Sequence, residues 1–273
     1  MANPFPLNLG PLRSAMELTL HTHHAVRIWK GRPAGEGKKG IIGLYGFVRL
    51  MNKIKRAAEQ DDPYADYWMI RIREKLEQSR AALALMWDQL NELMGRQPTS
   101  ARVGDNLNVH PVTMPLSINT LLGFLAVYRL IDYDNIVLRL LLAYHTALMG
   151  RRDMERWINA GGRVLRSLFS LAQQARLSGA MREDFIANNA VAREAQERLG
   201  ELPADVLVGT RRSEYAPQII RCRVSDERPP EVVEDEIEDE AEVGDDAGAS
   251  QVFLGAGLVA KSDGPLAPGR VMP

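Results

Sequence analysis

The sequence predicts a mainly α-helical protein with a small N-terminal β element and a disordered acidic tail. Apolar and polar residues alternate over residues 16–29, which is the period of a half-buried strand. Through much of residues 41–217, apolar residues recur at the spacing of amphipathic helices. Beyond residue 217 the composition turns acidic, with too few apolar residues to form a core.

The alternating stretch at residues 16–29 gives the predicted strand two unlike faces. Its even positions are largely apolar and include Leu18, Leu20 and Ile28, so this face is expected to be buried. The odd positions carry hydrogen-bonding and basic side chains, among them Thr19, His21, His23 and Arg27. The next segment, GRPAGEGKKG at residues 31–40, is rich in glycine and lysine, which indicates a flexible basic loop.

Two helices are expected after this loop, over residues 41–58 and 63–94. Asp62 and Pro63 are a typical helix start, because aspartate caps backbone N–H groups and proline fits the first turn. Glycines around the first of these helices indicate that it begins late, or that another segment packs closely against its backbone. These glycines are Gly40, Gly43 and Gly46. The strand and both helices make a predicted unit over residues 1–95.

A turn-rich stretch over residues 96–116 is the predicted linker to a helical domain at residues 117–217. Serine and aspartate in this domain are placed to cap helices, and apolar spacing predicts two more helices near its end. The expected features are a helix capped by Ser117, another capped by Asp132 or Asp134, and helices over 163–177 and 182–199.

Charge is strongly segregated along the 273 residues, although the formal net charge is only −1. Residues 226–246 hold twelve acidic side chains and one basic one, a net of −11. The remainder therefore carries about +10, since −1 minus −11 is +10. A basic folded part indicates polyanionic partners, and the predicted tail, residues 218–273, is a solvated acidic run.

The sequence is expected to belong to a soluble, cytoplasmic protein. Its first 30 residues lack the continuous apolar core of a signal peptide. The single cysteine, Cys222, excludes an intramolecular disulfide and fits a reducing compartment. The most hydrophobic segment, residues 121–149, contains charges too costly for a membrane span. These charges are Arg129, Asp132, Asp134 and Arg139.

The histidine-rich stretch TLHTHHAVRIWKGR, residues 19–32, has three competing interpretations. His21 and His23 would share one face of a strand, but no third ligand at suitable spacing supports a metal site. An ordinary solvated strand is the simplest interpretation. The third interpretation is a nucleic-acid contact, because the predicted face with Thr19 and Arg27 is well supplied with hydrogen-bond donors.

No catalytic constellation stands out in the sequence. GEGKKG at residues 35–40 resembles a phosphate-binding loop, but Arg32 replaces its first glycine and Lys39 replaces the serine or threonine that follows the lysine. On a helix, Asp132 and Asp134 would point in different directions. The sequence also has no G-x-S-x-G elbow, no H-E-x-x-H pair and no zinc-finger spacing. It therefore predicts no enzyme, no cofactor and no metal.

Three blocks of the sequence resemble the accessory proteins of genomic-island-type integrating conjugative elements. These blocks are residues 12–32, 114–150 and 204–217, and the resemblance spans roughly residues 7–217. Members tend to be encoded near a single-strand-binding protein and a topoisomerase, which the resemblance implies as candidate partners. The group is also similar to the AcaB-like transcriptional regulators of conjugative plasmids.

The similarity to AcaB-like regulators implies a ribbon-helix-helix unit, in which one strand precedes two helices. The strands of two copies pair antiparallel in such a dimer and enter the major groove of DNA. The predicted order of a strand at 16–29 and helices at 41–58 and 63–94 fits this scheme. By this resemblance, base edges would be met by Thr19, His21, His23 and Arg27. The phosphate backbone would be held by Lys30, Arg32, Lys38 and Lys39.

The predicted function is that of a dimeric, DNA-binding regulator or accessory protein of an integrating conjugative element. Double-stranded DNA and a second copy of the chain are its expected partners. The alternative is a non-enzymatic interaction protein in conjugative DNA processing or element maintenance. Such a protein would use its basic faces on single strands or on a protein partner, although it lacks the interleaved aromatics of a stacking platform.

Overall fold

The computed structural model describes residues 16–35, 37, 39–95, 104, 106 and 108–220. Its elements, in chain order, are β1 (Met16–Leu20), α1 (His23–Lys30), β2 (Gly31–Arg32), β3 (Ile41–Ile42), α2 (Leu44–Glu59), α3 (Pro63–Met94), β4 (Val112–Leu116), α4 (Leu121–His145), α5 (Arg151–Ala172), α6 (Arg182–Ile186), α7 (Ala190–Leu199) and α8 (Ala204–Val208). The mainly α-helical fold with a small β element is confirmed. Lys38 and the predicted tail from residue 221 onward lie outside the described residues.

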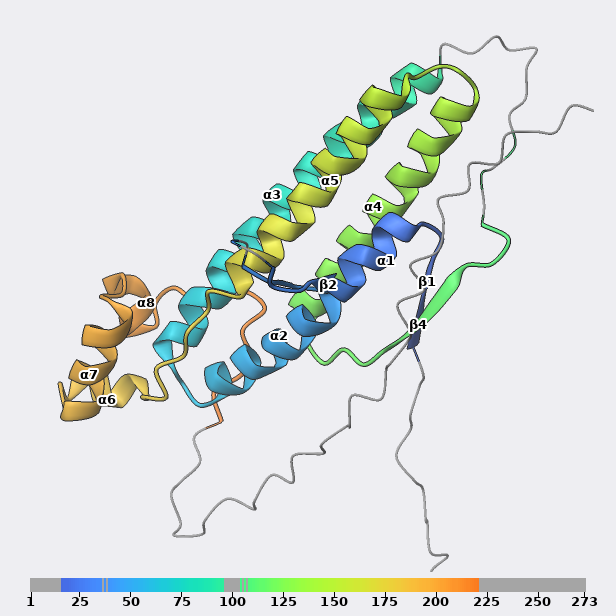
Figure 1. Ribbon diagram of the computed structural model, residues 1–273. Coiled ribbons are helices and arrows are strands. Elements are labelled where there is room, and N and C mark those ends of the chain that lie inside the picture. The colour runs from blue at the N-terminus through green and yellow to red at the C-terminus, as the bar shows by residue number, and fades with distance from the viewer. Residues whose placement is uncertain are drawn as a thin grey trace, which may run out of the picture. The chain divides into compact units, whose positions relative to one another are not determined.

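Three long helices, α3, α4 and α5, lie side by side and contact one another (Figure 1). The longest, α3, has 32 residues and is therefore about 48 Å long. Both α1 and α2 pack against these helices, and the rings of Phe47 and Phe169 lie 5.3 Å apart where α2 meets α5. One hydrophobic core includes helices from both sides of the predicted linker at residues 96–116.

The helix predicted over residues 63–94 is confirmed as α3. The Asp62 carboxylate accepts a hydrogen bond from the backbone N–H of Tyr64 at 2.9 Å, as a capping aspartate does. The same carboxylate accepts from the backbone N–H groups of Ser178 and Gly179 at 2.9 and 3.2 Å. This cap therefore also ties the chain that follows α5 to the start of α3.

The prediction that Asp132 or Asp134 starts a helix is wrong, because α4 runs without a break from Leu121 to His145. Its cap is Thr120 rather than Ser117, since the Thr120 hydroxyl accepts from the backbone N–H of Gly123 at 3.2 Å. Asp134 is instead buried in the middle of α4. There its carboxylate binds the backbone that precedes α1, as described below.

Two more helix boundaries differ from the prediction. α5 begins at Arg151, well before residue 163, and Met154 and Ile158 extend its buried stripe toward the N-terminus. The helix predicted over residues 182–199 is divided into α6 and α7. Asn188 adopts a positive φ of 48° between them, and the Asn189 side chain caps α7.

The predicted strand over residues 16–29 is wrong beyond Leu20, because residues 23–30 form α1. The Thr22 hydroxyl caps this helix by accepting from the backbone N–H of Ala25 at 3.2 Å. Ala25, Ile28 and Trp29 are buried, and their spacing of three and four residues is that of one helix face. The apolar residues of this stretch thus fit both the two-residue period of a strand and the 3.6-residue period of a helix, and the Thr22 cap favours the helix.

β1 pairs antiparallel with β4 of the same chain, in the stretch predicted as a linker. Leu18 and Leu20 on β1 are buried, whereas Thr19 is exposed and lies opposite Thr113. The partner strand seen here therefore belongs to the same chain, whereas the ribbon-helix-helix scheme pairs strands of two copies.

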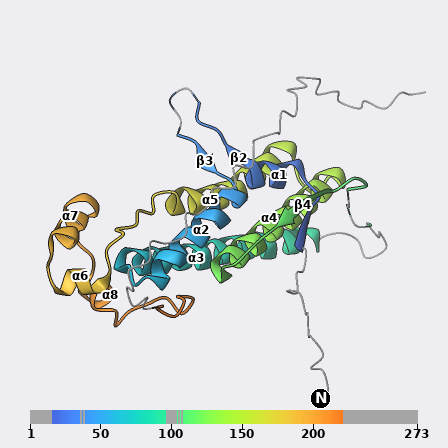
Figure 2. The ribbon, with the colours of Figure 1, turned by 90° about the horizontal axis from the view of Figure 1, so that it is seen from below.

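The predicted basic loop at residues 31–40 is framed by the two paired strands β2 and β3, and this hairpin extends away from the helices (Figure 2). A Cβ at Gly31 would lie 2.4 Å from the backbone nitrogen of Gly43. A Cβ at Gly43 would lie 1.9 Å from the carbonyl oxygen of Trp29. These backbones touch, as only glycine allows, and α2 also begins late, at Leu44.

The short helices α6, α7 and α8 lie beside the start of α3 (Figure 1). The buried Arg182 joins them to α3, because its guanidinium contacts Asp61 and lies 2.7 Å from the Asp66 carboxylate. Arg212 also contacts Asp66, at 2.8 Å. Two arginines therefore neutralise a fully buried carboxylate. None of the helices in the described part of the chain is long and apolar enough to cross a membrane.

Candidate nucleic-acid interface

The short helix α1 presents a cationic side to the surface. His23, Arg27 and Lys30 follow one another at spacings of four and three residues, so they share one side of the helix. All three are exposed, while Ile28 and Trp29 anchor the opposite side in the core. α1 thus holds three hydrogen-bond donors toward solvent on a fixed support.

A buried carboxylate fixes the start of α1. Asp134 of α4 accepts hydrogen bonds from the Thr22 hydroxyl at 2.6 Å, the Thr22 backbone N–H at 3.0 Å and the His21 backbone N–H at 2.8 Å. Hydrogen bonds to an ionised acceptor are stronger than neutral ones. The position of α1 on the bundle therefore depends on a residue more than a hundred positions away in the chain.

The β2–β3 hairpin continues the cationic surface beyond α1. Arg32 and Lys39 are both exposed, and the Arg32 guanidinium donates to the Lys39 carbonyl oxygen at 3.1 Å across the hairpin. Lys38, which was also predicted to contact phosphate, lies outside the described residues.

Two arginines of α5, Arg163 and Arg166, complete this surface. They are far from α1 in the sequence but close to it in the fold. Burial is the main reason that the pKa of the Arg166 guanidinium is below its ordinary value, with the Tyr133 hydroxyl opposing it. The neighbouring charges of Arg32, Arg27 and Arg163 lower that pKa further. Arginines from α1, β2 and α5 therefore lie close enough to repel one another.

The first turns of α5 show a different arrangement of charge. Arg151 lies 2.9 Å from Glu155, and Arg156 lies 2.8 Å from Asp153. These arginines are paired with acids of their own helix.

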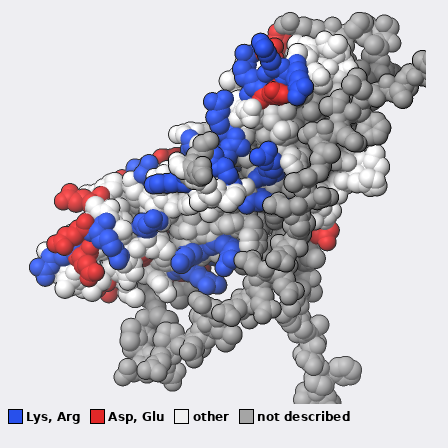
Figure 3. All heavy atoms as spheres, in the orientation of Figure 1, with Lys and Arg blue, Asp and Glu red and all other residues white. Residues whose placement is uncertain are grey.

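Figure 3 shows Lys and Arg side chains over α5 and α1, with acidic side chains mostly toward the start of α5 and toward α7. We name the exposed cations Arg27, Lys30, Arg32, Lys39 and Arg163 the basic face.

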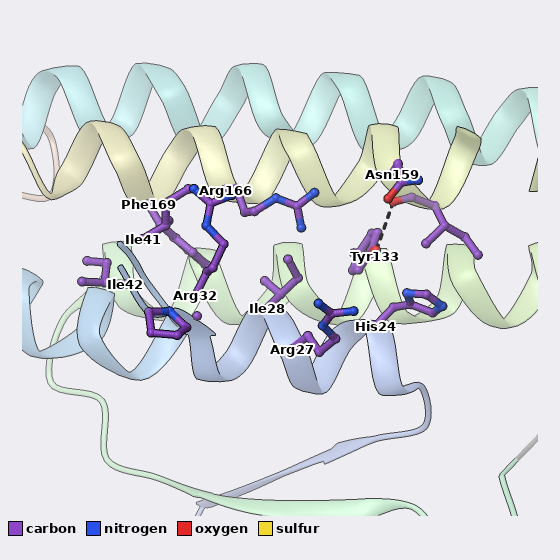
Figure 4. A pocket seen from close by; sticks show the side chains of 13 residues that line it. His24, Arg27, Ile28, Arg32, Ile41, Ile42, Tyr133, Asn159, Arg166 and Phe169 are labelled. Carbon is purple, nitrogen blue, oxygen red and sulfur yellow. Dashed lines mark hydrogen bonds between the residues drawn. The ribbon is translucent and has the colours of Figure 1, made fainter. Parts of the chain in front are cut away.

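A pocket of about 450 Å³ opens between α1 and α5, next to the basic face. Figure 4 shows Arg27, Arg32 and Arg166 around it, with Tyr133 of α4 between α1 and α5. The Tyr133 hydroxyl donates to the Ile158 carbonyl oxygen at 3.1 Å, and burial raises its pKa to about 12. This hydroxyl thus stays protonated at neutral pH.

His24 also lines this pocket, on the side of α1 that faces α5 (Figure 4). Burial lowers its pKa below the ordinary value, and the charges of His23 and Arg27 lower the pKa further. His24 is therefore a neutral hydrogen-bonding group at physiological pH.

The four residues predicted to contact base edges do not share one face of a strand, which corrects that expectation. Thr19 lies on β1, whereas His23 and Arg27 lie on α1. His21 connects the two elements, and its Nδ1 is buried without a hydrogen-bond partner among the described residues. The structure does bring together four predicted cations, listed above as part of the basic face: Arg27, Lys30, Arg32 and Lys39.

Sequence reasoning missed the contribution of Arg163, Arg166 and His24 to this surface. The excess of arginine over residues 151–182 was a signal of a basic segment. It did not show that this segment faces α1, because contacts across such a separation leave no local pattern. The described residues contain no group of three or more His, Cys, Asp or Glu side chains that could hold a metal ion.

A helical fold with surface arginines gathered on one face, none of them in a salt bridge to another described residue, suits a protein that meets polyanions. The chain belongs to the AcaB family, since the family model described as "Transcriptional regulator AcaB" matches residues 8–220. This confirms the resemblance to AcaB-like regulators, and the family is one of transcriptional regulators.

The chain is similar to a solved structure, the crystal structure of selenomethionine-containing AcaB from uropathogenic E. coli. The two chains are 14% identical, the match covers 72% of this chain and 98% of that one, and the TM-score is 0.47. No curated protein matches this sequence.

Proposed function

We propose that this regulator binds double-stranded DNA through the basic face. The observation that carries the proposal is that these cations have no acidic partner among the residues with a described position. Within the part of the chain that the structure describes, no salt bridge joins a carboxylate to Arg27, Lys30, Arg32, Lys39 or Arg163. Such cations are available to neutralise DNA phosphates and to release counterions. Membership of a transcriptional regulator family supports the same proposal.

Within this interface we assign two kinds of contact. His23 and Arg27 occupy successive turns of α1, and a helix can place such side chains against base edges in the major groove. Lys30, Arg32 and Lys39 would bind phosphates and fix the orientation of the protein on the duplex. Thr19 and His21 stay predictions, as does Lys38.

The first experiment is binding of the full chain to tiled duplex fragments of its host element at two salt concentrations. We predict one preferred fragment, whose preference over the others survives at higher salt. Arg27→Ala should weaken binding to this fragment by about 1–3 kcal/mol and relax the preference. Lys30→Ala should weaken binding to all fragments alike and reduce the salt dependence by about one phosphate contact.

Arg193→Ala is the matched control, because Arg193 is exposed on α7, away from α1 (Figure 1). It should leave both affinity and preference unchanged. Equal effects of Arg27→Ala and Arg193→Ala would exclude the basic face. Binding to single strands in preference to duplexes would favour an interaction protein in DNA processing.

We also propose that the protein acts as a homodimer in an integrating conjugative element, near its single-strand-binding protein and topoisomerase. The resemblance of residues 12–32, 114–150 and 204–217 supports this setting. Light scattering of the purified chain tests the dimer, and a monomer at concentrations that saturate DNA would exclude it.

A further inference from the structure

The pocket between α1 and α5 combines a cationic rim with an apolar floor. Arg27, Arg32 and Arg166 line it, each from a different element. Its floor is apolar, and the half-buried side chains of Ile41 and Ile42 of β3 contribute to it. A convex duplex could reach the rim but not this floor, so the pocket has room for chemistry that the basic face does not use.

Among the described residues, the rim arginines have no acidic partner. None of the described residues that line the pocket is acidic, and no salt bridge between described residues involves Arg27, Arg32 or Arg166. Like charges held together destabilise the free protein, unless an anion joins them. An arrangement that costs stability without serving the core is typical of a binding site.

The backbone makes specific room for the most buried of these arginines. A Cβ at Gly162 would lie 3.1 Å from both terminal nitrogens of Arg166 and 3.2 Å from the Tyr133 hydroxyl oxygen. The Arg166 guanidinium therefore rests over the bare backbone of its own helix, next to a hydroxyl that can still accept a hydrogen bond. The absence of a side chain at Gly162 thus leaves space for this guanidinium beside the pocket.

We propose that this pocket binds a small organic phosphate, with the phosphate held by Arg27, Arg32 and Arg166 and the organic body against Ile41 and Ile42. Guanidinium groups form paired hydrogen bonds to phosphate oxygens, and a doubly charged phosphate suits several arginines. The volume of about 450 Å³ lies in the range of small-molecule sites.

This site deepens the proposed function at one residue, because Arg27 belongs to both the pocket and the basic face. A bound phosphate would neutralise charge beside α1 and weaken DNA binding, so the ligand would act as an effector. Binding of a phosphate ligand to the pocket, however, can be tested without DNA.

The test is calorimetric titration of the full chain with adenosine 5′-monophosphate, with inorganic phosphate and with adenosine. We expect the nucleotide to bind one site per chain, phosphate to bind more weakly and adenosine to bind too weakly to measure. Arg166→Gln should weaken nucleotide binding about tenfold or more, because a charge-assisted hydrogen bond is lost. Arg152→Gln, an exposed position on the same helix, should leave it unchanged.

Thermal unfolding without ligand guards against a folding defect. Arg166→Gln should melt at the same or a higher temperature, because it removes a half-buried charge without an acidic partner. Arg32→Gln, on the exposed hairpin, is the second variant and should also weaken nucleotide binding. The proposal is overturned if the wild-type chain binds no nucleotide, or if both arginine variants bind it as tightly as the wild type.

The same variants separate this proposal from the proposed function. If the chain binds the nucleotide but no duplex, the nucleotide site is supported and the proposed DNA interface is contradicted. If the chain binds duplex but no nucleotide, only the proposed nucleotide site is contradicted.

Discussion

Two adjacent glycines on α5 have unlike neighbours, although both are buried. A Cβ at Gly161 would lie 2.9 Å from two ring carbons of Tyr133. That ring is 2% exposed and its hydroxyl donates to the Ile158 carbonyl, so it has little freedom to move. At Gly162 the nearest atoms are the terminal nitrogens of Arg166, the mobile end of a long side chain.

We predict that Gly161→Ala lowers the free energy of unfolding by about 1–2 kcal/mol, because overpacking against Tyr133 exceeds the gain in helix propensity. Gly162→Ala should cost less than about 1 kcal/mol, since Arg166 can move aside, the gain in helix propensity offsets part of the cost, and only the Tyr133 hydroxyl oxygen, at 3.2 Å, stays close. Urea denaturation of both variants measures the difference. Equal losses would show that α5 shifts as a whole.

At the scale of single elements, α1 depends on a residue that is distant in the sequence. It has eight residues, too few to be stable as an isolated helix in water. Its cap residue, Thr22, is held by Asp134 through the hydroxyl and the backbone N–H. Helix α1 is thus a part of the bundle surface rather than an independently folded DNA-binding element.

We predict that Asp134→Ala lowers the free energy of unfolding by about 2–4 kcal/mol, because it leaves buried donors of His21 and Thr22 without a partner. Hydrogen exchange should rise first in α1. Asp132→Ala is the control two positions away: Asp132 forms only a partly exposed ion pair with Arg129 at 3.1 Å, which is worth less than about 1 kcal/mol. Similar losses in both variants would contradict an anchoring role for Asp134.

The elements also show why sequence reasoning succeeded for α3 and failed for α1. The signals that define α3 are local, since Asp62, Pro63 and the apolar stripe lie within the helix or next to it. Residues 21–29 fit a strand and a helix alike, and Asp134, which supports the helical cap, is 112 positions from Thr22.

The candidate site was predictable only in part, for the same reason. Arg27, Lys30, Arg32 and Lys39 are close in sequence, so their shared surface could be expected. Arg166 reaches the same place from another helix. Only the packing of α5 against α1 shows that it lies near the other arginines.

For the molecule as a whole, the separation of charge is the dominant electrostatic feature. Residues 226–246 carry a net charge of −11, against about +10 on the remainder. If the basic face binds DNA as proposed, an acidic segment on the same chain would compete with non-specific DNA for it.

We therefore predict that deletion of residues 224–273 raises the affinity for non-specific duplexes several-fold at low salt, and less at high salt. A chain of full length with residues 226–246 neutralised to Gln and Asn should behave like the deletion. If the affinity for non-specific duplexes is unchanged in both proteins, the acidic segment does not compete with DNA. An effect of the deletion alone would point to length rather than charge.

The hydrogen bonds between Asp134 and the start of α1 have a consequence for biosynthesis. A chain leaves the ribosome from its N-terminus, so residues 21–30 emerge long before Asp134 and Arg166. Helix α1 cannot take its final position until α4 and α5 have been made. A nascent or prematurely ended chain therefore carries the cations of α1 without the surface that arranges them, and such fragments cannot substitute for the complete regulator at its target.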